Sequence, residues 1–283
     1  KRARSAGAQV QCGREVSAVD VRGGRAVAVH TRDGGTVRVR RAVVADVSAP
    51  SLYERLLPHE AVPARLLQDL QHFTWDTPVV KVNYALDAPI PWRSKSLQGA
   101  GTVHLGADSH GLIRWLADLN TATIPDHPFL LFGQMSTADP SRSPAGTESA
   151  WAYTHLPREH NDDGSADDQV LEEHAPGFGS HVVGRVVQRP SDLQSSDANL
   201  SGGAVNGGTA QLQQQLIFRP SPGFGRAETP IANVFLGSAS AHPGGSVHGV
   251  CGHNAAHAAL KSDGFRGWPR RRLNQTVISL FVK

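Results

Sequence analysis

Cysteine and long hydrophobic runs are scarce in this sequence. Of its 283 residues only Cys12 and Cys251 are cysteines, and they lie far apart. Two isolated thiols exclude a disulfide framework and a cysteine zinc site, and they are typical of a reducing compartment, so we expect a cytoplasmic protein. No stretch approaches the ~18–20 apolar residues that span a bilayer, and the first residues do not have the pattern of a signal peptide.

A large excess of one charge is also absent. Lys and Arg number 28 against 25 Asp and Glu, a net charge of +3, which argues against a nucleic-acid-binding surface. With 39% hydrophobic and 19% charged residues, the composition is that of a folded globular chain. The one dense basic run is Arg270–Arg272, which we interpret as part of a solvated tail; contact with anionic lipid or RNA is the alternative.

Several catalytic and nucleotide-binding motifs are missing. No G-x-G-x-x-G loop is present, because Gly99-Ala-Gly101 and Gly177-Phe-Gly179 both lack the third glycine at the required offset. No G-x-S-x-G elbow is present either, and neither cysteine has an evident activating partner. These absences argue against an α/β-hydrolase and against a complete dinucleotide-binding half within this sequence.

What is present begins with a run of short strands. Alternating apolar residues separated by glycine-containing turns predict a three-stranded meander. A more apolar segment then predicts a strand in a buried sheet, and leucine spacing predicts helices broken near Pro58 and Pro63. The expected segments are strands at 16–22, 25–30, 36–40 and 42–45, with helices between 51 and 70.

The middle of the chain has a different texture. Residues 73–190 mix strand-like runs with loops. Strands are expected at 79–84 and 129–132, and a helix is expected at 166–174.

A glycine-rich segment, 199–210, follows the middle region. Such a segment is either a flexible linker or backbone pressed against a neighbour. Arg189, Gln215 and Arg219 flank it or follow it, and they could hold a substrate or brace the glycine loops. We favour bracing, in which these side chains bond to backbone carbonyls.

Residues 230–256 form the most informative block. The apolar segment 231–236 predicts a strand that ends at Gly237, a Pro-Gly-Gly turn follows, and small residues predict a helix up to about Leu260. The first turn of such a helix has unpaired N–H groups and the positive end of the helix dipole, which favour an anionic or electron-rich group. Gly244 and Gly245 would allow a ligand to approach the main chain.

Four histidines in and beside this block form a second candidate, a metal site. His253 and His257 are four residues apart on one helical face, a spacing that zinc ligands can have. No Glu follows His253 as in H-E-x-x-H, and the sequence has 14 histidines in all. Chance clustering accounts for the group better, and we expect no metal ion.

Several segments carry a resemblance through their order and spacing. They are Arg189–Leu193, Asn199–Gly203, Gly207-Gly208, Arg219-Pro220, Thr229–Gly237, His242–Gly249 and Asn254–Ala256. Together they resemble the C-terminal half of the phytoene desaturase-related FAD-dependent oxidoreductases. That family is grouped with carotenoid desaturases and, more distantly, with amine oxidases.

The resemblance implies an α/β fold and a cofactor. The expected fold is the C-terminal portion of a two-domain, glutathione reductase-like FAD flavoprotein, lacking the N-terminal Rossmann strand, loop and helix. The cofactor implied is FAD, and no metal is implied. The inferred cofactor contacts are Gly237, Gly244, Gly245, Val247, His248 and Gly249. Ser246 stands where the family often has a third glycine.

The same resemblance implies a domain division and a reaction. Residues 1–57 and 190–262 would return to the FAD-binding domain, 58–189 would form the substrate domain, and 263–283 would form a divergent tail. The expected reaction is a dehydrogenation or desaturation in which an apolar small molecule transfers a hydride to the flavin. No catalytic base is named.

Two interpretations of the whole chain stay open. The first is a fragment of such an enzyme, and the alternative is a non-enzymatic remnant that binds an apolar ligand or a partner protein without a cofactor. A nucleic-acid partner is not expected. Peripheral membrane contact is kept as a further alternative, and the oligomeric state is left open.

Overall fold

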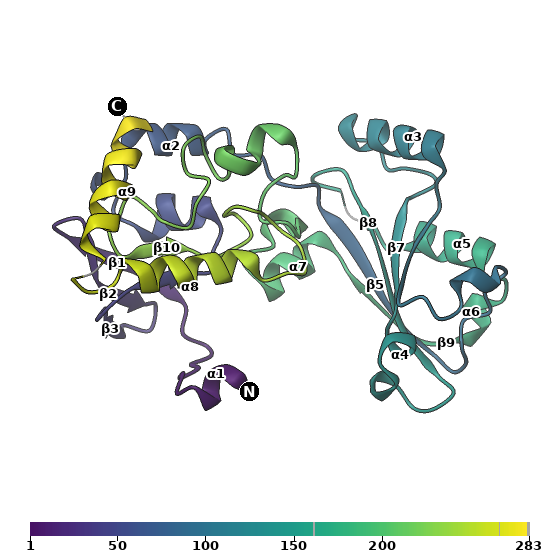
Figure 1. Cartoon of the computed structure of the whole chain (residues 1–283). Coiled ribbons are helices and arrows are strands. Elements are labelled where there is room, and N and C mark those ends of the chain that lie inside the picture. Colours follow the sequence, from purple (N-terminus) through teal and green to yellow (C-terminus); the bar gives the residue numbers. More distant parts are fainter. Residues whose placement is uncertain (161, 266, 282–283) are drawn as a thin grey trace. The chain divides into compact units, whose positions relative to one another are not determined.

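The chain forms two compact units. The computed structural model describes residues 1–160, 162–265 and 267–281 (Figure 1). Unit 1 comprises Lys1–Trp75 and Asn206–Lys283, and unit 2 comprises Asp76–Val205. Each unit has its own cluster of buried hydrophobic side chains.

Unit 1 contains two small sheets. The first is an antiparallel meander of β1 (Val16–Arg22), β2 (Arg25–Thr31) and β3 (Thr36–Arg38), as the alternating pattern predicts. The second pairs β4 (Val43–Ala45) with β10 (Val234–Leu236) in parallel, which confirms that the apolar 42–45 segment enters a buried sheet. The helices of unit 1 are α1 (Arg2–Ser5), η1 (Ser51–Leu56), η2 (His59–Ala61), α2 (Ala64–Leu70), η6 (Leu212–Gln214), η7 (Leu216–Phe218), α8 (Val250–Ser262) and α9 (Trp268–Phe281).

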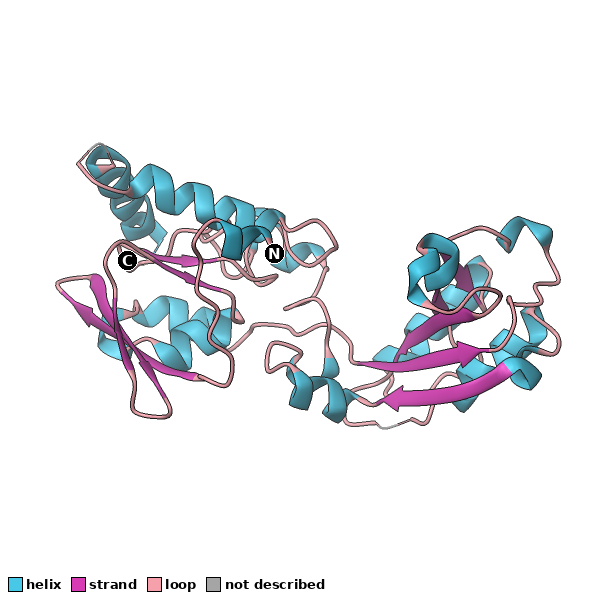
Figure 2. Ribbon diagram, turned by 90° about the horizontal axis from the view of Figure 1, so that it is seen from below, coloured by secondary structure: helices cyan, strands magenta, loops and turns pink. Residues whose placement is uncertain are grey.

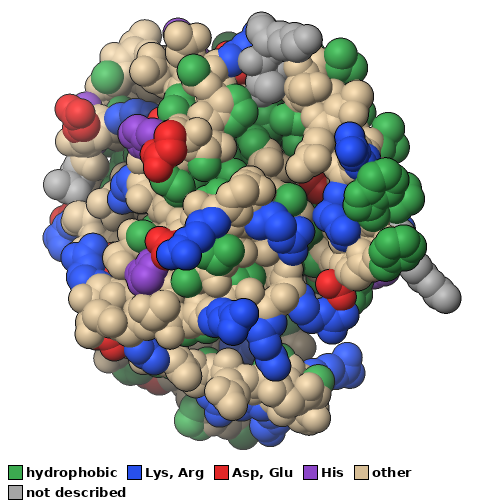
Figure 3. All heavy atoms as spheres, turned by 90° about the vertical axis from the view of Figure 1, so that its left-hand side faces the viewer, with side chains coloured by type: hydrophobic (Ala, Val, Ile, Leu, Met, Phe, Trp, Pro, Cys, Tyr) green, Lys and Arg blue, Asp and Glu red, His purple; other side chains and the backbone are tan. Residues whose placement is uncertain are grey.

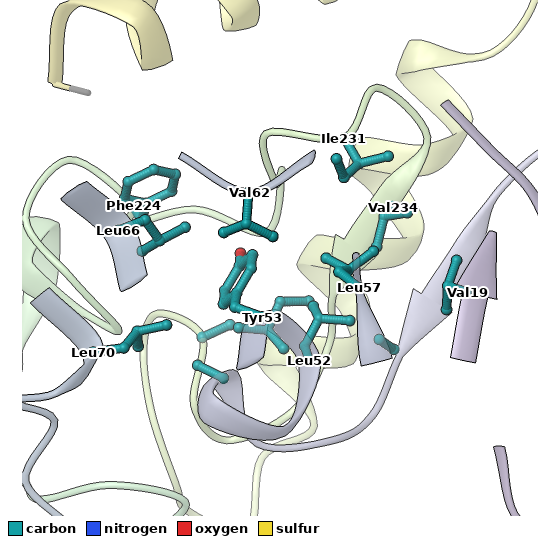
Figure 4. Close-up of a cluster of buried hydrophobic side chains, with 14 of the residues drawn as sticks. Val19, Leu52, Tyr53, Leu57, Val62, Leu66, Leu70, Phe224, Ile231 and Val234 are labelled. Atoms are coloured by element: carbon teal, nitrogen blue, oxygen red, sulfur yellow. The ribbon is translucent and has the colours of Figure 1, made fainter. Parts of the chain in front are cut away.

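The core of unit 1 surrounds a buried tyrosine (Figure 4). Tyr53, on η1, is 1% exposed, and residues from η1, α2 and the segment before β10 lie around it. Pro58 and Pro63 separate η1 from α2, as predicted, because proline disrupts the hydrogen-bond ladder of a helix interior. The labelled neighbours are Val19, Leu52, Leu57, Val62, Leu66, Leu70, Phe224, Ile231 and Val234.

Unit 2 is built on a five-stranded antiparallel sheet (Figure 2) with the order β6-β7-β8-β5-β9. Side chains of one face, such as Tyr84 and Phe132, are buried with Leu171 of α5 and Phe178 of α6. The strands are β5 (Val79–Leu86), β6 (Thr102–Leu105), β7 (Leu130–Gln134), β8 (Glu148–His155) and β9 (Val182–Gln188). The helices are η3 (Lys95–Leu97), α3 (Ser109–Asn120), α4 (Met135–Ala138), η4 (Pro140–Arg142), α5 (Ser165–His174), α6 (Phe178–His181), α7 (Pro190–Ser196) and η5 (Ser201–Gly203).

The unit boundaries differ from the expected 57/58 and 189/190. Residues 58–75 belong to unit 1 because Leu66 and Leu70 are buried in its core. Residues 190–205 belong to unit 2, where Ala204 forms a bridge with Pro78. The expected tail 263–283 contains α9 and contributes Ile278 to the unit 1 core.

One predicted strand is shorter in the structure. The sequence predicts a strand over 231–236, and β10 covers only Val234–Leu236. The preceding residues turn instead, because Thr229 Oγ1 accepts a bond from the Ile231 N–H at 3.1 Å. The Asn233 side chain points back to β2, where it bonds both the N–H and the C=O of Ala26.

Candidate cofactor and substrate sites

The parallel pair in unit 1 places two strand ends together. β4 and β10 run in the same direction, and the Gly237 N–H continues the pair by donating to the Ala45 carbonyl at 2.8 Å. In open α/β sheets, ligands bind outside the carboxyl ends of parallel strands. The loop that leaves β10 at this edge, residues 238–249, is the segment that the sequence analysis singled out.

This loop leads directly into α8. Gly249 precedes the helix with φ +64°, a left-handed conformation that glycine adopts at little cost. The Val250 N–H donates to Nδ1 of His248 at 2.9 Å, so this imidazole caps one N–H of the first turn. An α-helix leaves further first-turn N–H groups without intrahelical partners, and these groups and the dipole favour negative charge.

Arg219 braces the glycine-rich segment, as the sequence analysis favoured. Its side chain is almost fully buried, and its nitrogens donate to backbone carbonyls of two loops. The accepting carbonyls include Ala239 at 2.7 Å, Thr209 at 2.8 Å and Asn206 at 2.9 Å. One guanidinium group therefore holds the chain before η6 against the loop that follows β10.

A neighbouring glutamine also braces the segment. Gln214, which is buried, accepts from the Thr74 N–H at 2.8 Å and donates to the Thr74 carbonyl at 2.9 Å. The sequence predicts this bracing role for Gln215, one residue away, which is only half-buried in the structure. Residue spacing could not separate these two adjacent glutamines.

The glycine-rich segment is packed backbone, which decides between its two predicted forms. A Cβ at Gly203 would lie 2.5 Å from Pro190, and one at Gly208 would lie 2.7 Å from Phe73. A Cβ at Gly207 would lie 2.9 Å from Ala239. Glycine is therefore required at these positions by the chain's own close contacts.

The same explanation applies to the Pro-Gly-Gly turn. A Cβ at Gly245 would lie 2.7 Å from Oδ1 of Asn206, and one at Gly244 would lie 3.1 Å from Nε of Arg219. Both glycines therefore have a packing role inside unit 1. Their contact with a cofactor stays a prediction.

The other predicted contacts lie on the surface. Val247, His248 and Gly249 are exposed, and no atom lies within 4 Å of a Cβ built on Gly249. Gly237 is half-buried, with a would-be Cβ 3.1 Å from Val44 and 3.4 Å from Ala255. The predicted residues are thus brought together in one loop, with open space beside its last three members.

The other candidate side chains of this block are one cysteine and a pair of histidines. Cys251 is buried and contacts the Ala241 and Gly244 carbonyls at 3.4 and 3.3 Å, as expected for a packed thiol. The rings of His253 and His257 lie 4.2 Å apart between centroids. Among the residues that the structure describes, no three His, Cys, Asp or Glu side chains form a group suited to a metal ion.

A match to a known family covers most of the chain. Residues 2–259, and so parts of both units, match the family described as flavin containing amine oxidoreductase. The chain belongs to this family. FAD is accordingly its cofactor class, and its mixed α/β fold is that of FAD-dependent oxidoreductases.

Individual relatives agree with this membership. This family member is 27% identical over 278 residues to the mouse pyridine nucleotide-disulfide oxidoreductase domain-containing protein 2, covering 90% of this chain and 47% of the relative. It is 24% identical to the lycopene-forming phytoene desaturase of Pseudescherichia vulneris, covering 51% of it. The chain therefore spans about half the length of the curated relatives it matches.

Solved structures share the fold. A redesigned putrescine oxidase superimposes with a TM-score of 0.59 at 16% identity, covering 92% of this chain and 50% of that one. An oxidoreductase from Methanosarcina mazei superimposes with a TM-score of 0.55 at 14% identity, covering 91% of this chain and 51% of that one. At these identities the likeness concerns the fold alone.

In this flavoprotein-family chain, unit 2 adds a residue that the sequence analysis missed. Lys81 lies on the sheet face opposite the unit 2 core, and its register partners are Tyr153 on β8 and Gln188 on β9. Its Nζ donates to Oδ1 of Asn83 at 2.5 Å, and partial burial lowers the pKa of the ammonium group. An apolar alternation with one lysine in the middle of a strand was the available signal.

Aromatic side chains lie beside Lys81 on that face. Trp151 and Tyr153 stack with ring centroids 5.8 Å apart, and Trp151 pairs in register with Asn83. Val186, opposite Asn83 on β9, is 62% exposed. A lysine of lowered pKa beside two amide side chains and an aromatic pair is typical of a functional site.

Proposed function

We propose that this chain supplies the flavin-facing loop and the substrate unit of an FAD-dependent dehydrogenase or desaturase. The observation that carries the proposal is the family match over residues 2–259, which includes the loop after β10 and the sheet of unit 2. Unit 1 would be the part that contacts the cofactor, and unit 2 the part that binds substrate. The expected substrate is an apolar small molecule.

The loop after β10 has features suited to a flavin. Val247, His248 and Gly249 are exposed beside the first turn of α8, where unpaired N–H groups and the helix dipole favour negative charge. Nδ1 of His242, in the same loop, is buried and has no hydrogen-bond partner among the described residues. When bound, the flavin would supply the chemistry, accepting a hydride from the substrate carbon. The loop's part would be to hold it and to stabilise negative charge.

The open face of the unit 2 sheet would hold the substrate. Trp151, Tyr153 and Val186 offer apolar surface, and Lys81 offers an ammonium group that partial burial makes easier to deprotonate than that of an ordinary lysine. Apolar contacts of this kind contribute to binding in proportion to the area removed from water. We therefore assign substrate orientation to the aromatic pair and proton handling to Lys81.

The direct test is retention of FAD. The purified chain is incubated with FAD and desalted, and its visible absorption is recorded while circular dichroism reports folding. We expect retained flavin in the wild type and loss of it in Val247→Asp, because a carboxylate at an exposed loop position would repel a negatively charged cofactor. Val10→Asp, also exposed in unit 1, is the matched control and should retain flavin.

The alternative, a remnant without a cofactor, has a distinct outcome. A wild-type chain that is folded and retains no flavin would overturn the proposal for this polypeptide. If flavin is retained, Lys81→Met should slow flavin reduction by apolar substrates about 10- to 100-fold without changing FAD retention. Lys95→Met, an exposed lysine of unit 2, should change neither.

A further inference from the structure

Helix α9 is fixed to unit 1 along one side only. Ile278 is buried in the unit 1 core, and Nδ2 of Asn274 donates to Glu228 at 3.2 Å. Arg271 donates to the Gly264 carbonyl at 2.9 Å from the same side of the helix. These contacts determine which side of α9 faces away from the unit.

The opposite side of α9 carries apolar side chains in water. Leu273 and Leu280, seven residues apart and so on one helical face, are 63% and 72% exposed. Trp268, at the start of the helix, is 53% exposed, and Phe265 in the preceding turn is 94% exposed. Several large exposed apolar side chains on one short segment are typical of an interaction surface in a folded protein.

Basic residues surround these apolar side chains. The sequence from Gly264 to Lys283 contains no Asp or Glu, and Arg272 lies 5.3 Å from the Trp268 ring. Arg272 and Lys261 are exposed, whereas Arg270 forms an ion pair with Glu228 at 2.8 Å. Figure 3 shows basic side chains spread over the face of unit 1 that carries α9 and the β1–β3 sheet, with hydrophobic side chains beside them.

We propose that this surface, formed by Phe265, Trp268, Leu273, Leu280 and the flanking Arg272 and Lys261, attaches the protein to the surface of an anionic membrane. A helix with Trp and Leu on its outer face and arginine beside them lies in the interface between headgroups and acyl chains. Each basic residue near anionic lipid adds to the attachment through its attraction to the negative surface potential. The attachment proposed is at the surface of the bilayer. Within residues 1–160, 162–265 and 267–281, no helix is long and apolar enough to cross a membrane.

The composition of the surface favours lipid over other partners. Pairing two copies through the outer side of α9 would bring the two Arg272 side chains together, and residues 264–283 offer no acidic side chain to pair with them. Nucleic acid would be bound through the basic residues and would leave the leucines and Phe265 in water. The family match ends at residue 259, so the family resemblance assigns this surface no role.

Vesicle co-sedimentation tests the proposal on the full chain. We expect binding to phosphatidylcholine vesicles that contain phosphatidylserine, and binding weaker by about tenfold or more to pure phosphatidylcholine or at high salt. The double variant Leu273→Ser/Leu280→Ser should bind the mixed vesicles about tenfold more weakly. Ile113→Ser/Leu116→Ser, which changes two exposed apolar residues of α3 in unit 2, should bind like the wild type.

Three results would overturn the proposal. The first is equal binding of the two double variants to the mixed vesicles, and the second is equal binding of the wild type to neutral and anionic vesicles. The third is a wild-type chain that does not bind vesicles but forms a dimer, which Leu273→Ser/Leu280→Ser dissociates. If the chain binds RNA and does not bind vesicles, the basic residues are assigned to another partner. Circular dichroism and unchanged FAD retention show that a weaker variant is still folded, and the vesicle result does not depend on whether flavin is retained.

Discussion

In unit 1, the paired strands β4 and β10 come from opposite ends of the sequence, whereas the unit 2 sheet takes all five strands from one continuous stretch. The difference extends to how the loops are held. In unit 1 a single buried arginine, Arg219, bonds carbonyls of two loops, and Asn233 joins the turn before β10 to β2. In unit 2 the sheet packs on apolar side chains of α5 and α6.

The two units therefore depend on different interactions for their stability. Short parallel strands bury little surface, so unit 1 needs polar side chains to fix its loops. The unit 2 sheet buries a continuous apolar face and tolerates an unpaired acid, Asp167, whose Oδ2 is buried without a partner among the described residues. A substitution in one unit should therefore lower the stability of that unit and leave the stability of the other unchanged.

Loss of Arg219 should have the largest effect. Arg219→Met leaves the carbonyls of Ala239, Thr209 and Asn206 without their donor, and we expect unit 1 to lose about 3–5 kcal/mol of unfolding free energy. Hydrogen exchange followed by mass spectrometry measures this segment by segment, with unit 2 unchanged. Arg226→Met is the control, since Arg226 makes only one long contact, 3.5 Å to Gly223, among its described hydrogen bonds. Equal losses in both variants would contradict the bracing role.

The acid in unit 2 should make that unit sensitive to pH. Burial, together with Asp162 and Asp168, raises the pKa of Asp167 to about 8. The folded state then keeps a proton that the unfolded state releases near pH 4, so the unfolding free energy falls as pH rises between these values. We expect a loss of about 2 kcal/mol in unit 2 between pH 5 and pH 7, measured by urea unfolding.

Asp167→Asn should remove most of this pH dependence. Glu173→Gln changes an exposed carboxylate on the same helix and should leave the dependence as it is. A wild-type unit 2 with the same stability at pH 5 and pH 7 would show that Asp167 is ionised in the folded state.

Asn233 should matter next. Its side chain bonds the N–H and C=O of Ala26 at 2.8 and 3.0 Å and is 6% exposed. Asn233→Leu keeps the branching and the number of side-chain heavy atoms and leaves both backbone groups buried without partners, so unit 1 should lose about 2 kcal/mol, seen as a lower urea midpoint. A change below about 0.5 kcal/mol would mean that water replaces the side chain.

The smallest effect should distinguish two glycines of the predicted cofactor loop. Gly245→Ala brings a methyl group against Asn206, and we expect a loss of about 1–3 kcal/mol. Gly249→Ala meets no atom within 4 Å, and its only cost is the positive φ of +64°, about 1 kcal/mol. Thermal unfolding of both variants gives the order, and a reversed order would show that Asn206 moves aside.

Local patterns in the sequence predicted the meander of unit 1, the strand, turn and helix around β10 and α8, and the family, whereas β6, β8, β9 and α9 were not predicted. Alternation of apolar residues is a local property, so β1, β2 and β3 lie where the pattern predicts them. The strand end at Gly237, the glycine-rich turn and α8 also follow from local signals, and their order along the chain carries the family resemblance. Bracing was favoured for Arg219 from the sequence, and the structure gives its physical reason, because a buried arginine must find acceptors.

Which residues contact one another is set by the folded structure. Contacts between segments far apart in sequence set the unit boundaries and the short β10, and they give the bracing role to Gln214 and not to Gln215. No local pattern in the sequence reports such contacts. Lys81 was missed because its lowered pKa arises from burial, which is set by neighbouring strands. Likewise, the sequence indicated a solvated tail around Arg270–Arg272. In the structure Ile278 packs in the unit 1 core and fixes one side of α9, and Leu273 and Leu280 face solvent.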